Sequence, residues 1–270
     1  MRNRRNANSS TRTVGLLLVL FAVLVTVLYS GAYLRMHSRP AAPIHAYMPQ
    51  AKVPILMYHS IAEPGKDLSV STKDFEEQLK WLAENGFTPI TLGQLERYWD
   101  GSYEVDGKPV VITFDDGYLD NYTDAYPVLL KYHDPATIFI ITDSIKRKNH
   151  MSWDQMKEMH AHGIEFGSHM VYHSNFLHTA LDQISWELTA SKRALEKGLG
   201  SPVTTFCYPG GGLIPEASRL VHDAGYTIAV TTQDEWADQS QDRLLLSRVR
   251  VVGGMKLDEF ARRLQAPLQQ

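Results

Sequence analysis

The sequence contains a single cysteine, Cys207, among 270 residues, which excludes an intrachain disulfide and leaves stability to a hydrophobic core. It has no excess of positive charge, and its formal net charge of -3 excludes a broad basic surface for nucleic acid. The GxGxxG loop of dinucleotide-binding sheets is missing, and no internal repeat is visible. No protein partner can be inferred. What remains is an ordinary globular composition, with 44% hydrophobic and 21% charged residues.

The amino terminus carries a long uncharged run. Residues 14–34 are 21 residues without a charged side chain, about the length that a helix needs to cross a bilayer. Four arginines precede this run and two follow it closely, so the positive-inside bias places residues 1–13 in the cytoplasm. We expect an uncleaved transmembrane signal-anchor. The alternative is a signal peptide that is cleaved near residues 30–32.

Residues 35–52 contain three prolines and are expected to be a linker, so the working domain spans residues 53–270, outside the cytoplasm. The predicted strands are 53–58, 88–91, 110–114, 136–141, 164–169, 203–208, 227–232 and 245–252. The predicted helices are 73–85, 92–99, 120–132, 153–162, 180–197, 215–224 and 257–264. This alternation predicts an α/β fold, a distorted (β/α) barrel of about seven units with its functional groups on the loops after the strands; an open doubly wound sheet is the alternative.

Two adjacent carboxylates, Asp115 and Asp116, end the predicted buried strand in the stretch VVITFDDGY. Successive side chains of a strand point to opposite faces, so both acids can enter one site only if the chain turns at Asp116 and Gly117. Two like charges side by side are costly unless a neighbouring charge balances them. A plain Asp-Gly turn is the alternative reading.

Two histidines follow a later strand in the stretch GSHMVYH. His169 and His173 are four residues apart, a spacing that places two imidazoles on the same face of a helical turn. Two histidines and one carboxylate make a three-ligand metal site with open positions. A cation beside Asp116 would remove the repulsion and leave Asp115 ionised as a base. A solvated or core histidine pair is the alternative, and His178 is expected at the surface.

The combination of TFDDGY with HMVYH resembles the polysaccharide deacetylase family, the NodB-homology carbohydrate esterases, over about residues 53–264. The resemblance implies a distorted (β/α) barrel that removes acetyl groups from N-acetylated sugars of a polysaccharide. It implies Asp115 as the general base. It also implies a divalent metal, usually zinc, with Co²⁺, Ni²⁺ or Fe²⁺ as alternatives, held by Asp116, His169 and His173.

Two further family features map onto later strands. Tyr208 in FCYPGGG is the implied oxyanion and substrate contact through its backbone N–H, and a core aromatic is the alternative. The arginine that orients the base in the family is missing from its usual place at Phe206 and Cys207. Arg248 or Arg250 in LSRVRV could supply the guanidinium, since arginine can bind a carboxylate through two hydrogen bonds. We take Arg250 as the candidate, and a surface salt bridge is the alternative.

The family's late Leu-x-His motif, the source of the general acid, is not evident. The stretch VPILMYHSI resembles the opening motif of the branch that acts on poly-β-1,6-N-acetylglucosamine, and its His59 is the candidate general acid. A buried structural histidine is the alternative. In QDEW, Asp234 is a candidate for orienting a catalytic group and Trp236 for stacking on a sugar ring. A loop acid and a rim aromatic are equally good readings of these two residues.

Other functions share parts of the pattern. An iron(II) oxygenase also uses two histidines and a carboxylate, although Asp115 would then have no task. A glycoside hydrolase needs two acids about 5 Å or more apart, which sequence neighbours do poorly. An O-acetyl esterase of the xylan type or a non-catalytic glycan-binding protein could share the site. The prediction is a membrane-anchored, metal-dependent deacetylase of a cell-wall or extracellular glycan that contains N-acetylglucosamine, secreted if the amino terminus is cleaved.

Overall fold

The computed structural model describes residues 51–63, 65 and 67–265. The predicted cytoplasmic tail, the signal-anchor at 14–34 and all but the last two residues of the linker lie outside these residues. Within the described part of the chain, no helix has the length and apolar character needed to span a bilayer.

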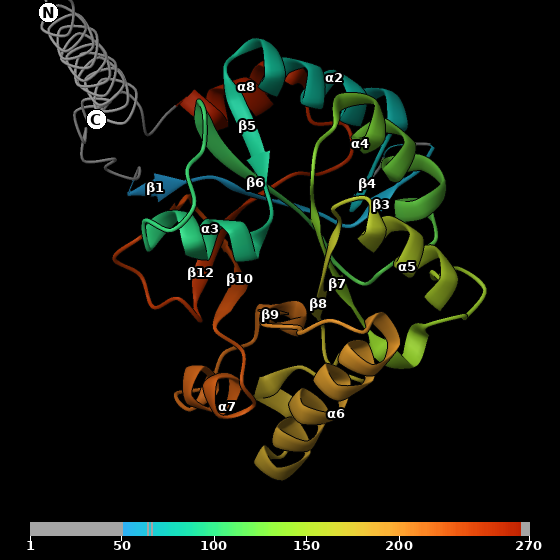
Figure 1. Cartoon of the computed structure of the whole chain (residues 1–270), viewed down its shortest axis with the longest axis vertical. Helices are drawn as coiled ribbons and strands as arrows, with labels where there is room; N and C mark the ends of the chain where they lie inside the picture. The colour runs from blue at the N-terminus through green and yellow to red at the C-terminus, as the bar shows by residue number, and fades with distance from the viewer. Residues whose placement is uncertain (1–50, 64, 66, 266–270) are drawn as a thin grey trace, which may run out of the picture. The chain divides into compact units, whose positions relative to one another are not determined.

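Seven parallel strands close into a barrel (Figure 1). Their order around the ring is β2, β12, β10, β9, β8, β7 and β6, and β6 pairs again with β2. The strands are β2 (Ile55–Tyr58), β6 (Lys108–Phe114), β7 (Thr137–Ile140), β8 (Glu165–Ser168), β9 (Thr205–Cys207), β10 (Ile228–Asp234) and β12 (Leu246–Arg250). An eighth strand, β5 (Phe87–Ile90), pairs with the first half of β6. The predicted barrel of about seven units is confirmed, and the open sheet is excluded.

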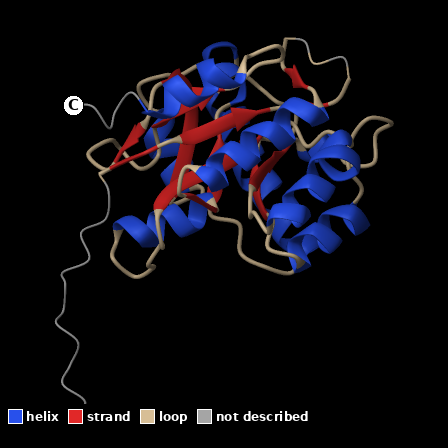
Figure 2. Cartoon of the chain, turned by 90° about the horizontal axis from the view of Figure 1, so that it is seen from above, coloured by secondary structure: helices blue, strands red, loops and turns tan. Residues whose placement is uncertain are grey.

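Helices surround the strands, as the view in Figure 2 shows. They are α2 (Thr72–Glu84), α3 (Leu92–Trp99), α4 (Tyr126–Tyr132), α5 (Trp153–Ala161), α6 (Leu181–Leu199), α7 (Ala217–Asp223) and α8 (Leu257–Gln265). Two short ribbons complete the described strands: β1 (Lys52–Val53) pairs with β11 (Ala237–Asp238), and β3 (Ser60–Ile61) with β4 (Ser69–Val70). The predicted helix 120–132 begins as a π-helical turn, Asn121–Ala125, and continues as α4. Every other predicted helix is present with its ends within two residues of the predicted ones.

Capping side chains define the starts of α3 and α5. Thr91 and Ser152 each accept a hydrogen bond from a backbone N–H three residues on, and the glutamine there bonds back to the cap residue. Such reciprocal capping satisfies donors that the first turn leaves free, and each cap contributes about 1 kcal/mol. These starts place α3 directly after β5 and α5 before β8.

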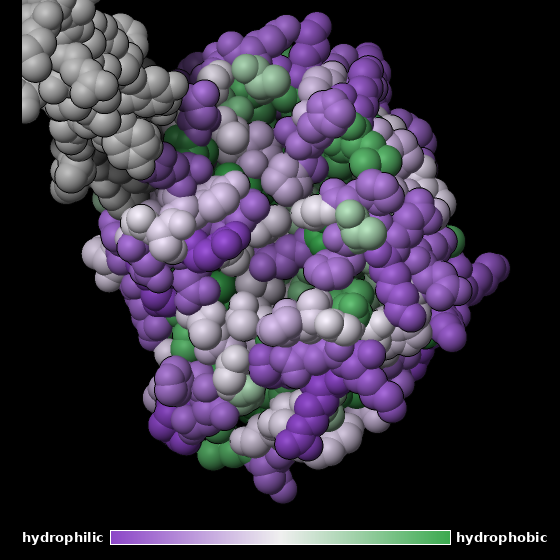
Figure 3. Space-filling model, in the orientation of Figure 1, coloured by the Kyte–Doolittle hydropathy of each residue, from purple (hydrophilic) through white to green (hydrophobic). Residues whose placement is uncertain are grey.

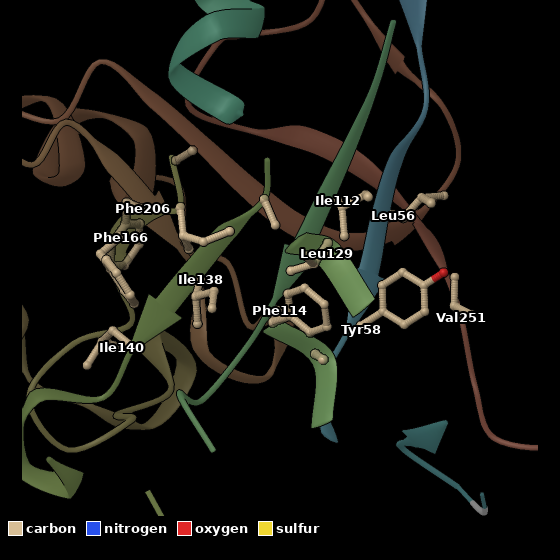
Figure 4. Packing of buried hydrophobic residues seen from close by; sticks show 14 of the residues in the cluster. Leu56, Tyr58, Ile112, Phe114, Leu129, Ile138, Ile140, Phe166, Phe206 and Val251 are labelled. Carbon is tan, nitrogen blue, oxygen red and sulfur yellow. The ribbon is translucent and has the colours of Figure 1, made fainter. Parts of the chain in front are cut away.

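The larger hydrophobic cluster lies between the strands and the helices (Figure 4). Tyr58, Phe75 and Phe114 form an aromatic triangle with ring centroids 5.3–5.7 Å apart. Aromatic pairs of this kind add about 0.5–1.5 kcal/mol beyond their burial. The buried Tyr58 hydroxyl donates to Gln78 at 2.7 Å. This packing fixes the ends of β2 and β6, where His59 and Asp115 follow.

The second cluster fills the barrel interior, because alternate strand residues point inward. Ile55, Val111, Phe139, Val230 and Leu246 are fully buried there. Helix α3 covers the amino-terminal end of the ring: its first N–H groups donate to side chains at the starts of β7 and β8. The interior is therefore closed at that end, and a ligand could approach it only from the carboxyl ends of the strands.

The outer surface is mainly polar. The face in Figure 3 is mostly hydrophilic, with separate small hydrophobic areas and no large continuous one. A face of this kind, without a large apolar patch, is ordinary for the surface of a globular domain.

Candidate active site

The two adjacent aspartates lie where the chain leaves β6. Asp115 is 2% exposed, and its N–H donates to the carbonyl of Tyr58 on the neighbouring strand. Asp116 then takes a φ of 74°, which is rare for a residue with a side chain, and Gly117 follows at 77°. This is the turn that the sequence analysis requires for both acids to enter one site, and both line the same cavity. Strain of this kind persists where the surrounding structure holds it, and it is common in functional sites.

Arg248 grips the Asp115 carboxylate inside the barrel. Its Nη1 and Nη2 donate to the two oxygens at 2.7 and 2.8 Å, and Arg248 is fully buried. Burial alone would raise the pKa of Asp115, but the charge and hydrogen bonds of Arg248 outweigh it and hold that pKa well below its usual range. The carboxylate is therefore ionised at neutral pH, as a base requires.

The prediction that Arg250 orients the base is wrong. Arg248 and Arg250 point to the same side of β12 because they are two residues apart, but only Arg248 lies deep enough to reach Asp115. Its Nη2 also contacts the Cys207 sulfur at 3.2 Å, beside the place where the family arginine was sought. A guanidinium from another strand thus occupies that space.

Asp116, His169 and His173 converge as a candidate metal centre. One oxygen of Asp116 lies 3.6 Å from Nε2 of each histidine, and the donor atoms of all three lie within 4.8 Å of one another. The His169 Nδ1 contacts the Cys207 carbonyl at 2.7 Å, which leaves Nε2 turned to the site. Burial lowers the pKa of His169 despite the two nearby carboxylates, which favours the neutral imidazole that a metal needs. The donor set therefore fits a divalent cation.

The histidine pair is not on a helix, contrary to the reasoning from its spacing. Residues 169–174 form an irregular loop in which Met170 and His173 have φ values of 68° and 59°. The loop still brings the two imidazole centroids to 4.7 Å. The convergence is confirmed, but its cause is a strained loop.

A second set of donors, Asp115, His169 and Cys207, is also close together. Both oxygens of Asp115 are already bonded to Arg248, and burial raises the pKa of the Cys207 thiol well above its ordinary value. A protonated thiol is a poor metal ligand. The set with Asp116 and His173 is therefore the better cation site.

The His59 side chain also lies close to Asp115. Its Nε2 lies 3.7 Å from Oδ2 of Asp115, and its side chain is 15% exposed. Its Nδ1 is buried without a hydrogen-bond partner among the described residues. His59 lines the same cavity of about 270 Å³ as Asp115, Asp116, His169 and His173.

The structure does not support Tyr208 as the oxyanion contact. Its N–H donates to the carbonyl of Val230 at 3.2 Å, and its ring is fully buried against Phe176 and Phe206. Gly210, two residues later, lines the cavity instead. At Gly211 a Cβ would lie 1.8 Å from Oγ1 of Thr232, so this glycine-rich turn passes close to the neighbouring strand.

Asp234 and Trp236 have structural partners. The two oxygens of Asp234 accept from Arg263 at 3.0 Å each, and one also accepts from the Arg250 N–H. The Trp236 indole donates to the Arg263 carbonyl, and its ring packs on the core. Neither residue lines the cavity with the metal donors. The structure therefore does not support Asp234 as an orienting acid or Trp236 as a residue that stacks on sugar. Both residues instead connect the end of β10 and the segment after it to α8.

Glu187 is a site residue that the sequence analysis missed. It lies on α6, is fully buried, and accepts hydrogen bonds from the N–H groups of Val171 and Tyr172 and from the Ser174 hydroxyl. These donors flank His173. The available signal was a charged residue on the apolar face of α6, the face that also carries Ile184, Leu188 and Ser191.

The barrel and the site together have the arrangement of a hydrolase: an ionised carboxylate lies beside three donors that fit a cation, at the carboxyl ends of parallel strands. A sequence profile described as polysaccharide deacetylase matches residues 102–229. YxkH of Bacillus subtilis (strain 168), whose name assigns it to the polysaccharide deacetylases, is 41% identical over 210 residues, covering 78% of this chain and 75% of that protein. A poly-beta-1,6-N-acetyl-D-glucosamine N-deacetylase of Staphylococcus aureus is 26% identical over 210 residues, 73% and 72% of the two chains.

The fold is shared with a solved relative. The Streptococcus pyogenes deacetylase PplD, solved in complex with acetate, superposes with a TM-score of 0.75 at 29% identity over 80% of this chain and 98% of that one. The chain belongs to the polysaccharide deacetylase family. It is a hydrolase that acts on the C–N bonds of acetylated polysaccharide.

Proposed function

We propose that this protein removes N-acetyl groups from a cell-wall or extracellular glycan that contains N-acetylglucosamine. The observation that carries the proposal is the Arg248-bound carboxylate of Asp115 beside the converging donors of Asp116, His169 and His173. The activity named for the Staphylococcus aureus relative and the acetate bound to PplD support it. Acetate is the product that such a reaction releases.

A divalent cation held by Asp116, His169 and His173 would polarise the acetamide carbonyl and activate water. We propose zinc, because two imidazoles and one carboxylate with an open position suit it, and Co²⁺, Ni²⁺ or Fe²⁺ as substitutes.

Asp115 and His59 then carry out the two proton transfers of the reaction. Asp115 takes a proton from the attacking water as the water oxygen bonds to the carbonyl carbon. We assign the stabilisation of the developing oxyanion to the backbone N–H of Gly210, because this residue lines the cavity. His59 gives a proton to the amide nitrogen as the C–N bond breaks, and acetate and a free amino sugar remain.

We also propose that the domain works outside the cytoplasm. The basis is the uncharged run at residues 14–34 with its preceding arginines, which would tether the domain to the membrane or direct its export.

The test of function is acetate release from a panel of polymers. Poly-N-acetylglucosamine, peptidoglycan, chitin oligomers and acetyl xylan are incubated with purified protein, with chelator-treated protein and with chelator-treated protein given back Zn²⁺. We expect metal-dependent acetate release from an N-acetylated polymer without new reducing ends. Acetate from acetyl xylan alone would replace the amidase proposal by an esterase, and no acetate from any polymer would refute both.

A His59→Ala variant tests the general acid. Because the amide nitrogen is a poor leaving group without a proton, we expect kcat to fall about 10²–10⁴-fold. The zinc content should stay unchanged because His59 is not one of the three donors. The control is His178→Ala, an exposed histidine, with activity within about twofold of the parent protein. Undiminished turnover in His59→Ala would remove this residue from the mechanism.

A further inference from the structure

The Arg250 side chain is left without a role by the mechanism, although it lies at the mouth of the barrel. Arg248 and Arg250 project to the same side of β12. Arg248 ends inside the barrel on Asp115, so Arg250 stands one layer closer to the opening. It lines the cavity together with His59, Asp115 and the three metal donors.

The Arg250 guanidinium makes no hydrogen bond or ion pair among the described residues, and its charge acts only at longer range on the Asp234 carboxylate. The neighbouring carboxylate, Asp234, is already engaged: Arg263 bonds to both of its oxygens, and the Arg250 backbone N–H takes a further bond to one of them. The backbone of Arg250 also serves the fold, since its carbonyl accepts from Arg263. The backbone of Arg250 thus helps to hold β12 against α8 and Asp234, whereas its guanidinium has no structural contact of this kind among the described residues.

The charges in the cavity leave Arg250 as a surplus cation. Arg248 balances the charge of Asp115, and a divalent cation would more than balance the charge of Asp116. The cavity of the loaded enzyme would therefore carry net positive charge, and a neutral sugar offers no charge to meet it. A partly enclosed guanidinium gains most from a carboxylate, which it can bind through two parallel hydrogen bonds.

We infer that Arg250 is a specificity-determining residue that binds a carboxylate of the glycan close to the acetamido group that is removed. The substrate class is an acidic N-acetylated glycan, in which the amino sugar or its neighbour carries a carboxylic acid. This inference rests on the proposed deacetylase function and narrows it.

The experiment compares two matched oligosaccharides. One alternates N-acetylglucosamine with N-acetylmuramic acid, and the other is the same compound with each lactyl carboxylate converted to an amide. Acetate release is measured for the zinc-loaded parent protein, Arg250→Gln and Arg250→Lys. The control is Arg219→Gln, which removes an exposed arginine on α7 that pairs with Asp223 outside the cavity.

We expect the parent protein to prefer the carboxylated oligosaccharide by about tenfold or more in kcat/KM, mainly through KM. Arg250→Gln should bring this ratio close to one, Arg250→Lys should keep part of it, and Arg219→Gln should keep all of it. High salt should weaken the preference of the parent protein, which tests the charge contact without any variant.

The outcomes separate the inference from the function on which it rests. A parent protein that releases acetate equally from both compounds, or faster from the amide, overturns the inference and leaves the deacetylase proposal intact. An equal loss on both compounds in Arg250→Gln shows a structural role and overturns it as well. If no N-acetylated polymer yields acetate, the proposed function fails and the inference fails with it.

Discussion

An Arg248→Met variant is expected to be both unstable and inactive. The substitution leaves the Asp115 carboxylate ionised in a buried site without its partner, and the loss of one member of a buried ion pair costs about 3–5 kcal/mol. Urea unfolding should therefore show a clearly lower midpoint. Acetate release should fall by at least about 10²-fold because the base is no longer held in position.

Two control variants separate the cause from a general loss of arginine. In Asp115→Asn with Arg248→Met neither charge of the pair remains, so most of the stability should return while activity stays lost. Arg263→Met removes a guanidinium that binds Asp234 just as Arg248 binds Asp115, but on a partly exposed surface, and should cost about 1 kcal/mol or less. If Arg248→Met were as stable and active as the parent protein, Asp115 would not depend on this pair.

A Glu187→Ala variant is expected to lose metal affinity without losing a metal ligand. The carboxylate holds the backbone on both sides of His173, so its removal frees the strained loop that presents this ligand. Loss of a group that positions a metal ligand weakens binding by about 10–100-fold. Titration of the metal-free protein with Zn²⁺, followed by calorimetry, measures the change directly.

The distinguishing result is rescue. Excess Zn²⁺ should restore part of the activity of the Glu187 variants, and Glu187→Gln should lie between Glu187→Ala and the parent protein because its amide oxygen can still accept from two N–H groups. The control is Asp182→Asn, an exposed carboxylate at the start of the same helix. Unchanged Zn²⁺ affinity in a folded Glu187→Ala protein would show that the loop holds His173 without this contact.

Much of the site could be predicted because it follows from local patterns. A buried strand that ends in two acids, and a histidine pair after a later strand, lie at the carboxyl ends of strands in any parallel barrel, and the structure brings them together. The closed ring also follows from the strict alternation of strands and helices. The register and depth of the strands were not contained in these patterns.

The predictions failed for residues whose role depends on their depth in the barrel or on the partner of their hydrogen bonds. Strand periodicity places Arg248 and Arg250 on one side, and only the position of Asp115 in the barrel selects Arg248. The motif around Tyr208 does not reveal that its N–H is used by the neighbouring strand β10. Trp236 reads equally as a rim aromatic or a core residue until α8 is placed beside it. These are tertiary facts, and one sequence does not encode them locally.

The closed amino-terminal end of the barrel determines where small molecules can enter and leave. In the part of the chain that the structure describes, helix α3 and the packed residues above it close the ring at its amino-terminal end. In the proposed reaction, water would therefore enter and acetate would leave through the opening at the carboxyl ends of the strands.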